Sequence, residues 1–66
     1  MRVTINGQPM TIDNNMNIND LLSSQGYDGK LVALAINGDF VAKSLYGERI
    51  ISDQDDIEIV APMQGG

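Results

Sequence analysis

The sequence has 66 residues, with nine acidic against four basic side chains and a net charge of −5 at pH 7. This length allows one small domain, and the acidic balance disfavours binding to the phosphates of nucleic acid. The absence of cysteine and histidine excludes disulfides, thiolate zinc sites and imidazole catalysis from this chain. No apolar run approaches the length of a membrane-spanning helix, so we expect a cytoplasmic protein without membrane contact.

The first segment predicts a β-hairpin. Apolar and polar residues alternate up to the turn pair Asn6-Gly7. A two-residue turn of type I′ pairs Val3 with Met10 and keeps the apolar side chains on one face. Because Pro9 has no backbone donor, the strand after the turn should lie at the edge of a sheet.

A short helix is expected next. Asn17 can cap its N-terminus, and Ile18, Leu21 and Leu22 fall on one stripe. The helix should end near Gly26, because glycine readily adopts the left-handed conformation that terminates helices.

A second hairpin should follow a turn at Asp28-Gly29. Residues 31–36 are almost all apolar, which is typical of a strand covered on much of both faces. The pair Asn37-Gly38 then predicts another tight turn.

An irregular connection over residues 43–56 leads to the last strand. Its expected apolar anchors are Leu45, Tyr46, Ile50 and Ile51. The acidic run at residues 53–56 lacks the glycine and the later glutamate of a calcium loop, so we interpret it as a solvated turn and expect no metal site. The strand at residues 57–60 is mostly apolar and should insert in the middle of the sheet, beside the first strand.

These elements predict an α+β fold in which a mixed sheet has one helix packed across one face. The apolar residues that both hairpin registers and the helix stripe turn inward form the expected core: Val3, Ile5, Met10, Ile12, Ile18, Leu21, Leu22, Leu34, Ile36, Ile57 and Ile59.

The opposite face of the sheet should carry an exposed apolar patch. The hairpin register sets Ala35 opposite Phe40, and alternation turns Ala33 and Val60 the same way. The expected rim consists of Arg2, Thr4, Lys43 and Glu58. An exposed apolar patch of this kind is a candidate partner-docking surface, although Phe40 folding over the sheet edge is an alternative interpretation.

The sequence closes on Gly65-Gly66. Two glycines carry no side chains, so the Gly66 carboxylate could pass through a narrow channel, and Gly65 would be required for that passage. The alternative is a frayed end without function. We expect residues 1–62 to form the domain and residues 63–66 a flexible C-terminal tail.

Five segments together resemble the ThiS family, the small sulfur carriers of thiamine thiazole biosynthesis. They are Asn6-Gly7, the helix residues 18–22, the strand and turn at residues 33–38, residues 55–60 and Gly65-Gly66. The resemblance covers essentially the whole chain. It implies the β-grasp fold of ubiquitin, a five-stranded mixed sheet with one helix across one face.

The resemblance also implies a mechanism. An adenylating enzyme of the ubiquitin-activating type would use ATP to activate the Gly66 carboxylate, and a sulfur donor such as a cysteine desulfurase persulfide would convert it to a thiocarboxylate. Thiazole synthase would then receive the sulfur. The chain would be a protein co-substrate without catalytic residues or a bound cofactor of its own.

Two other classes of function stay open, because fold and tail do not fix the partner. The chain could carry sulfur for molybdopterin or another sulfuration pathway. It could also be a ubiquitin-like modifier that forms isopeptide bonds, or a regulatory binding module.

Overall fold

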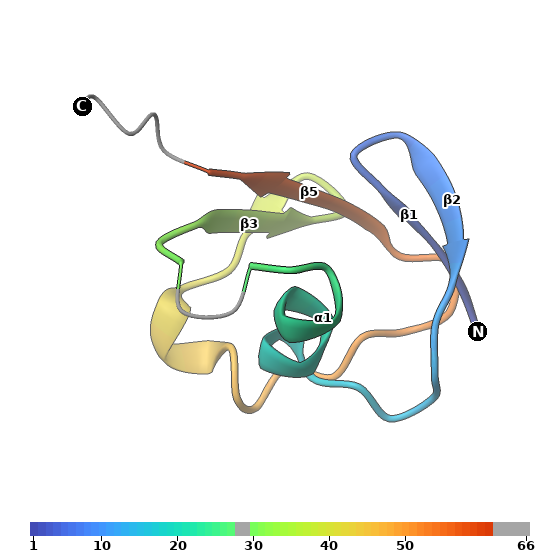
Figure 1. Ribbon diagram of the computed structural model, residues 1–66, viewed down its shortest axis with the longest axis horizontal. Helices are drawn as coiled ribbons and strands as arrows, with labels where there is room; N and C mark the ends of the chain where they lie inside the picture. Colours follow the sequence, from blue (N-terminus) through green and yellow to red (C-terminus); the bar gives the residue numbers. More distant parts are fainter. Residues whose placement is uncertain (28–29, 62–66) are drawn as a thin grey trace.

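The computed structural model describes residues 1–27 and 30–61, which form a five-stranded sheet with α1 packed against one face (Figure 1). The strands are β1 (Arg2–Ile5), β2 (Gln8–Thr11), β3 (Ala33–Ile36), β4 (Asp39–Phe40) and β5 (Asp56–Val60), and the helices are α1 (Ile18–Ser24) and the 3₁₀ turn η1 (Lys43–Leu45). The order across the sheet is β2-β1-β5-β3-β4, with β1 and β5 parallel and the other neighbours antiparallel. The predicted fold class and the central place of the last strand are confirmed.

The first hairpin has the predicted register. Asn6 and Gly7 have φ values of 51° and 82°, and the type I′ turn requires positive φ at both positions. Val3 faces Met10 across the pair of strands. Pro9 lies on β2 at the sheet edge, where its missing donor leaves no ladder bond unmade.

A reciprocal cap starts α1. The Asn17 side chain accepts a hydrogen bond from the Asp20 amide at 2.7 Å, and the Asp20 carboxylate accepts one from the Asn17 amide at 3.2 Å. The helix ends at Ser24, two residues before Gly26, whose φ of 85° stops it from continuing. The turn predicted at residues 28–29 lies outside the described residues.

The second hairpin also follows its predicted register. Asn37 and Gly38 have φ values of 53° and 88°, and Ala35 faces Phe40. The expectation that this strand is covered on much of both faces is wrong, because α1 covers one face and Ala33 is exposed on the other.

The core is the layer between α1 and the sheet. Its buried apolar residues are Val3, Ile5, Ile18, Leu21, Leu22, Val32, Leu34, Ile36, Tyr46, Ile51, Ile57 and Ile59. Of the expected core, Met10 and Ile12 are only partly buried, because β2 is the edge strand and the short helix does not reach across it.

The irregular connection was the least accurately predicted part of the core. Tyr46 and Ile51 are buried as expected, whereas Leu45 and Ile50 are 47% and 48% exposed. One turn of 3₁₀ helix at η1 directs Tyr46 inward and leaves its neighbour Leu45 facing out.

Candidate functional site: the end of β5 and the open face of the sheet

The central strand β5 leads directly to the end of the chain. It lies between β1 and β3 (Figure 1). It ends at Val60, and its residues Ile57 and Ile59 are buried. The strand that precedes the candidate functional group is therefore held on one side by β1 and on the other by β3. The predicted functional residues Gly65 and Gly66, and the predicted tail at residues 63–66, lie outside the described residues.

The structure brings the predicted patch together on the open face. Ala33 lies opposite Val60, and Ala35 lies opposite Phe40, so the patch spans β5, β3 and β4. The Phe40 side chain is 81% exposed and Val60 is 59% exposed. Because so little of its ring is covered, Phe40 does not serve to cover the sheet edge. We call these four residues the open-face patch.

Most of the predicted rim lies where the strand alternation placed it. Arg2 and Thr4 alternate with buried residues on β1, and Glu58 does so on β5. Lys43 differs from the expectation: it belongs to η1 and lines a hollow on the helix side of the molecule. Its position follows from the connection after β4, whose path the sequence did not predict.

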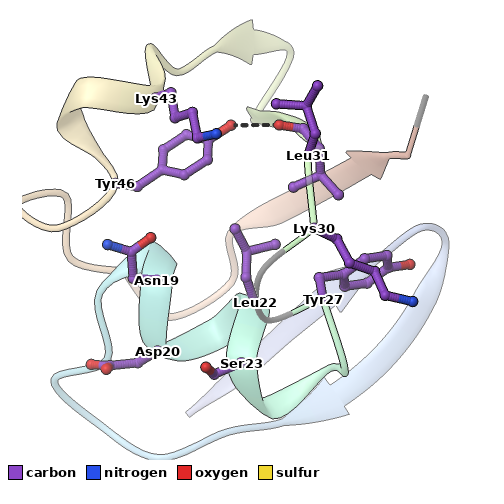
Figure 2. A pocket seen from close by; sticks show the side chains of 10 residues that line it. Asn19, Asp20, Leu22, Ser23, Tyr27, Lys30, Leu31, Lys43 and Tyr46 are labelled. Carbon is purple, nitrogen blue, oxygen red and sulfur yellow. Dashed lines mark hydrogen bonds between the residues drawn. The ribbon is translucent and has the colours of Figure 1, made fainter.

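That hollow, of about 560 Å³, lies between α1, the segment after it and η1 (Figure 2). The Tyr46 hydroxyl donates a hydrogen bond to the Val32 carbonyl at 3.4 Å on its wall. Burial raises the pKa of Tyr46, so its hydroxyl stays protonated at neutral pH. The tyrosine is thus a structural donor and does not supply a base to the hollow.

The acidic turn before β5 is structural. Asp55 is buried and accepts hydrogen bonds from the Asn37 side chain at 3.0 Å and from the Ser52 amide at 2.9 Å. Asp53 accepts one from the Arg2 amide at 2.8 Å, and this bond holds the pKa of the Asp53 carboxyl below its ordinary value. The interpretation of this run as a wholly solvated turn is therefore wrong for Asp55.

The described residues contain neither a cluster that could bind a metal ion nor a helix that could span a membrane. Within residues 1–27 and 30–61, no cluster of metal-ligating side chains occurs. In the same ranges, no helix is long and apolar enough to cross a membrane.

Two asparagines that sequence reasoning treated only as turn formers also hold β5. The Asn6 side chain accepts a hydrogen bond from the Ile59 amide at 2.8 Å and donates one to the Ile59 carbonyl at 3.3 Å. The Asn37 side chain accepts one from the Asp56 amide at 2.9 Å. The recurrence of asparagine as the first residue of both Asn-Gly turns was the available signal.

The geometry above is shared with known proteins. The ThiS family model matches residues 3–66. The chain belongs to the ThiS family. It is thus a member of a family of thiamine biosynthesis proteins, and its fold is the β-grasp fold of ThiS.

Solved structures of ThiS support this assignment over the whole chain. The crystal structure of thiamine biosynthesis protein ThiS from Geobacter metallireducens matches with a TM-score of 0.84 and 29% identity, covering 100% of both chains. The solution structure of a thiamine biosynthesis protein from the same organism matches with a TM-score of 0.83 and 29% identity, covering 100% of this chain and 88% of the other.

Similar proteins include one much longer chain. A thiazole synthase from Paramagnetospirillum magneticum is 36% identical across 100% of this ThiS-family chain, which spans only 20% of that protein's length. The uncharacterized protein ycf40 from Trieres chinensis is 36% identical, covering 94% of this chain and 85% of its own. The ycf40 protein of Porphyra purpurea is 28% identical, covering 97% of this chain and 90% of its own.

Proposed function

We propose that this chain is the sulfur carrier for the thiazole moiety of thiamine and that the Gly66 carboxylate carries the sulfur. The match to the ThiS family, which extends through Gly65-Gly66, is the observation that carries the proposal. The β-grasp domain supports it, because its central strand β5 leads directly into those last residues.

Activation is the first step of the proposed reaction. A carboxylate oxygen is a poor leaving group at neutral pH, so the Gly66 carboxylate must first be converted to a mixed anhydride. An adenylating enzyme of the ubiquitin-activating type joins it to the α-phosphate of ATP and releases pyrophosphate. The product is an acyl adenylate, whose acyl carbon is a strong electrophile.

Sulfur transfer is the second step. A persulfide sulfur, such as that of a cysteine desulfurase, attacks the acyl carbon and AMP leaves, which gives an acyl disulfide. Two electrons from a thiol reductant then cleave the sulfur–sulfur bond, leaving a thiocarboxylate on Gly66 and a thiol on the donor. The catalytic groups belong to the partner enzymes, and the carrier contributes the reacting carboxylate.

Thiazole synthase is the proposed acceptor of the sulfur. One relative joins a region similar to this whole chain to a protein that carries the name thiazole synthase. Two functions within one polypeptide raise the effective concentration of each for the other, which suits successive steps of one pathway. This relative favours the thiazole pathway over carriage for molybdopterin and over protein modification.

The open-face patch is the proposed docking surface for the adenylating enzyme. Phe40 and Val60 expose apolar area that a partner could cover, and Val60 is also the last residue of β5. A partner bound there would hold the domain next to the point from which the last residues reach its active site.

Reconstitution with the adenylating enzyme, ATP and a persulfide donor tests the proposal. Intact-mass measurement should show the exchange of one oxygen for sulfur, and a thiol-alkylating reagent should label the product. Deletion of Gly66 should abolish uptake, because it withdraws the reactive carbon by up to about 3.5 Å. Gly65→Ala should slow uptake, because a Cβ would restrict the backbone in the channel.

The outcomes separate the candidate functions. Sulfur uptake followed by transfer to thiazole synthase supports the proposal. Uptake without that transfer points to a carrier for another sulfuration pathway, and covalent conjugates on a gel point to a protein modifier. Equal uptake by the Gly66-deleted and full-length chains would refute Gly66 as the carrying group.

A further inference from the structure

The side of β5 that faces β1 changes its partner along the strand. The Thr4 amide donates to the Asp55 carbonyl at 3.0 Å, and the Asn6 amide donates to the Ile57 carbonyl at 2.9 Å. The chain then leaves for the turn at Gly7, so β1 has no backbone left for Ile59. In a regular ladder the amide and the carbonyl of Ile59, which both face this side, would each bond to a backbone group of β1.

The Asn6 side chain replaces the missing strand. Its carboxamide oxygen accepts from the Ile59 amide at 2.8 Å, and its nitrogen donates to the Ile59 carbonyl at 3.3 Å. A carboxamide offers the donor and acceptor pair of a peptide group, so it can satisfy both backbone groups of one residue. On the other side of the strand end, Val60 pairs with Ala33 of β3.

We propose that Asn6 is a positioning residue that fixes the direction in which the chain leaves β5. Its bonds to Ile59 are made one residue before the strand ends at Val60. Without them, the last residues of β5 would be held by β3 alone and could rotate about that single ladder. This inference rests on the proposed function, because the direction matters where Gly66 must reach a partner's active site.

The second hairpin contains a matched control. Asn37 also begins an Asn-Gly turn and has nearly the same φ, 53° against 51° for Asn6. Its side chain accepts from the Asp56 amide at 2.9 Å and donates to the Asp55 carboxylate at 3.0 Å, but Asp56 is the first residue of β5 and Asp55 precedes it. The same chemical change at the two positions therefore loosens opposite ends of one strand.

The experiment compares Asn6→Gly with Asn37→Gly in the full chain. Glycine keeps the positive φ of both turns, so only the side-chain bonds are lost. Asn6→Gly should accelerate amide hydrogen exchange at Ile59, and Asn37→Gly should do so at Asp56. A third variant, Asn6→Asp, keeps the acceptor for the Ile59 amide and should restore part of the protection.

The kinetic measurement is adenylation of each variant by the adenylating enzyme with ATP, followed by pyrophosphate release. Asn6→Gly should lower kcat about tenfold with KM nearly unchanged, because docking is intact while fewer bound molecules present the carboxylate in line. Asn37→Gly should stay within about twofold of the unchanged chain, and Asn6→Asp should be intermediate.

Each result decides a definite point. Faster exchange at Ile59 with unchanged kcat would make the Asn6 bonds purely structural and overturn the inference, as would unchanged exchange at Ile59. Equal kinetic losses for Asn6→Gly and Asn37→Gly would also overturn it, because general loosening of β5 would then explain both. Absence of adenylation in the unchanged chain would instead refute the proposed function, and this inference with it.

Discussion

The two faces of the sheet are built from the same strands, but one face is buried and the other is exposed. On β5, Ile57 and Ile59 are buried on the face that α1 covers, while Glu58 and Val60 alternate with them and are exposed. On β3, Leu34 and Ile36 are buried, and Ala33 on the other face is exposed. Alternation along a strand thus separates a stabilising face from one that is free to bind.

The comparison shows how a small domain can confine its core to one face of the sheet and leave the other face exposed. The covered face concentrates nearly all of the buried apolar area, so changes on the open face should leave folding almost unaffected. Residues of the open face can therefore be substituted for the sake of binding without loss of the fold. The predictions below test this separation, from the largest expected effect to the smallest.

Leu22→Ala should cause the largest loss of stability, about 2 to 5 kcal/mol, because it leaves a cavity between α1 and the sheet. Leu31→Ala removes the same atoms from a side chain that is 62% exposed, against 7% for Leu22. The free energy of unfolding from urea titrations should fall by less than about 0.5 kcal/mol for this control. Similar losses for both variants would contradict the division into a covered and an exposed set.

Phe40→Asp should weaken binding to the adenylating enzyme about tenfold or more, because it replaces the most exposed large apolar side chain of the open-face patch with a charge. Its stability should change little, since the ring is 81% exposed. Leu45→Asp is the control, because Leu45 is a 47% exposed apolar residue on η1, outside the patch. Calorimetric titration with folded variants should separate the two, and equal affinities would reject the patch as the docking surface.

A substitution in the turn before β5 can change the stability of the protein without altering a residue on either face of the sheet. Gln54 has a φ of 71°, which is unfavourable for a residue with a Cβ. Gln54→Gly should therefore raise the free energy of unfolding by about 0.5 kcal/mol, after the greater entropy of glycine in the unfolded chain is subtracted. Asn15→Gly, at a φ of 63°, should gain less because asparagine tolerates this conformation. A loss of stability for Gln54→Gly would show that its side chain is needed.

The smallest effect concerns pH. The Arg2 amide lowers the pKa of Asp53 in the folded chain, so the bond stabilises the fold above the ordinary aspartate pKa. This contribution is lost as the pH falls below about 4 and through the lowered pKa. Asp53→Asn should reduce the difference in unfolding free energy between pH 7 and pH 3. An unchanged difference in urea titrations at both pH values would contradict this.

Local sequence determined much of the fold. Each Asn-Gly pair set a hairpin register without help from the rest of the chain, because the turn geometry fixes which residues face each other. Asn17 and Asp20 likewise start α1 through bonds between residues three positions apart. The open-face patch followed from these registers, and Gly66 was proposed as the carrying group from the Gly65-Gly66 pair and the family resemblance.

Tertiary structure alone decided which residues of the irregular connection are buried. Tyr46 and Ile51 are in the core while Leu45 and Ile50 are exposed, although all four are apolar. Val32 differs, because it is buried beside the exposed Leu31 by continuing the alternation that buries Leu34 and Ile36. No repeating pattern indicates direction in the irregular connection, so the packing of neighbouring elements determines it.

The asparagine bonds to β5 show the same limit of local sequence. Sequence predicted Asn6 as a turn residue, but its bonds to Ile59 span 53 positions in the chain. They exist because β5 inserts beside β1 and extends past its end, and strand insertion is a property of the assembled sheet. Local preferences determine conformations of a few residues, whereas the partner of an unpaired backbone group depends on which strand ends beside it.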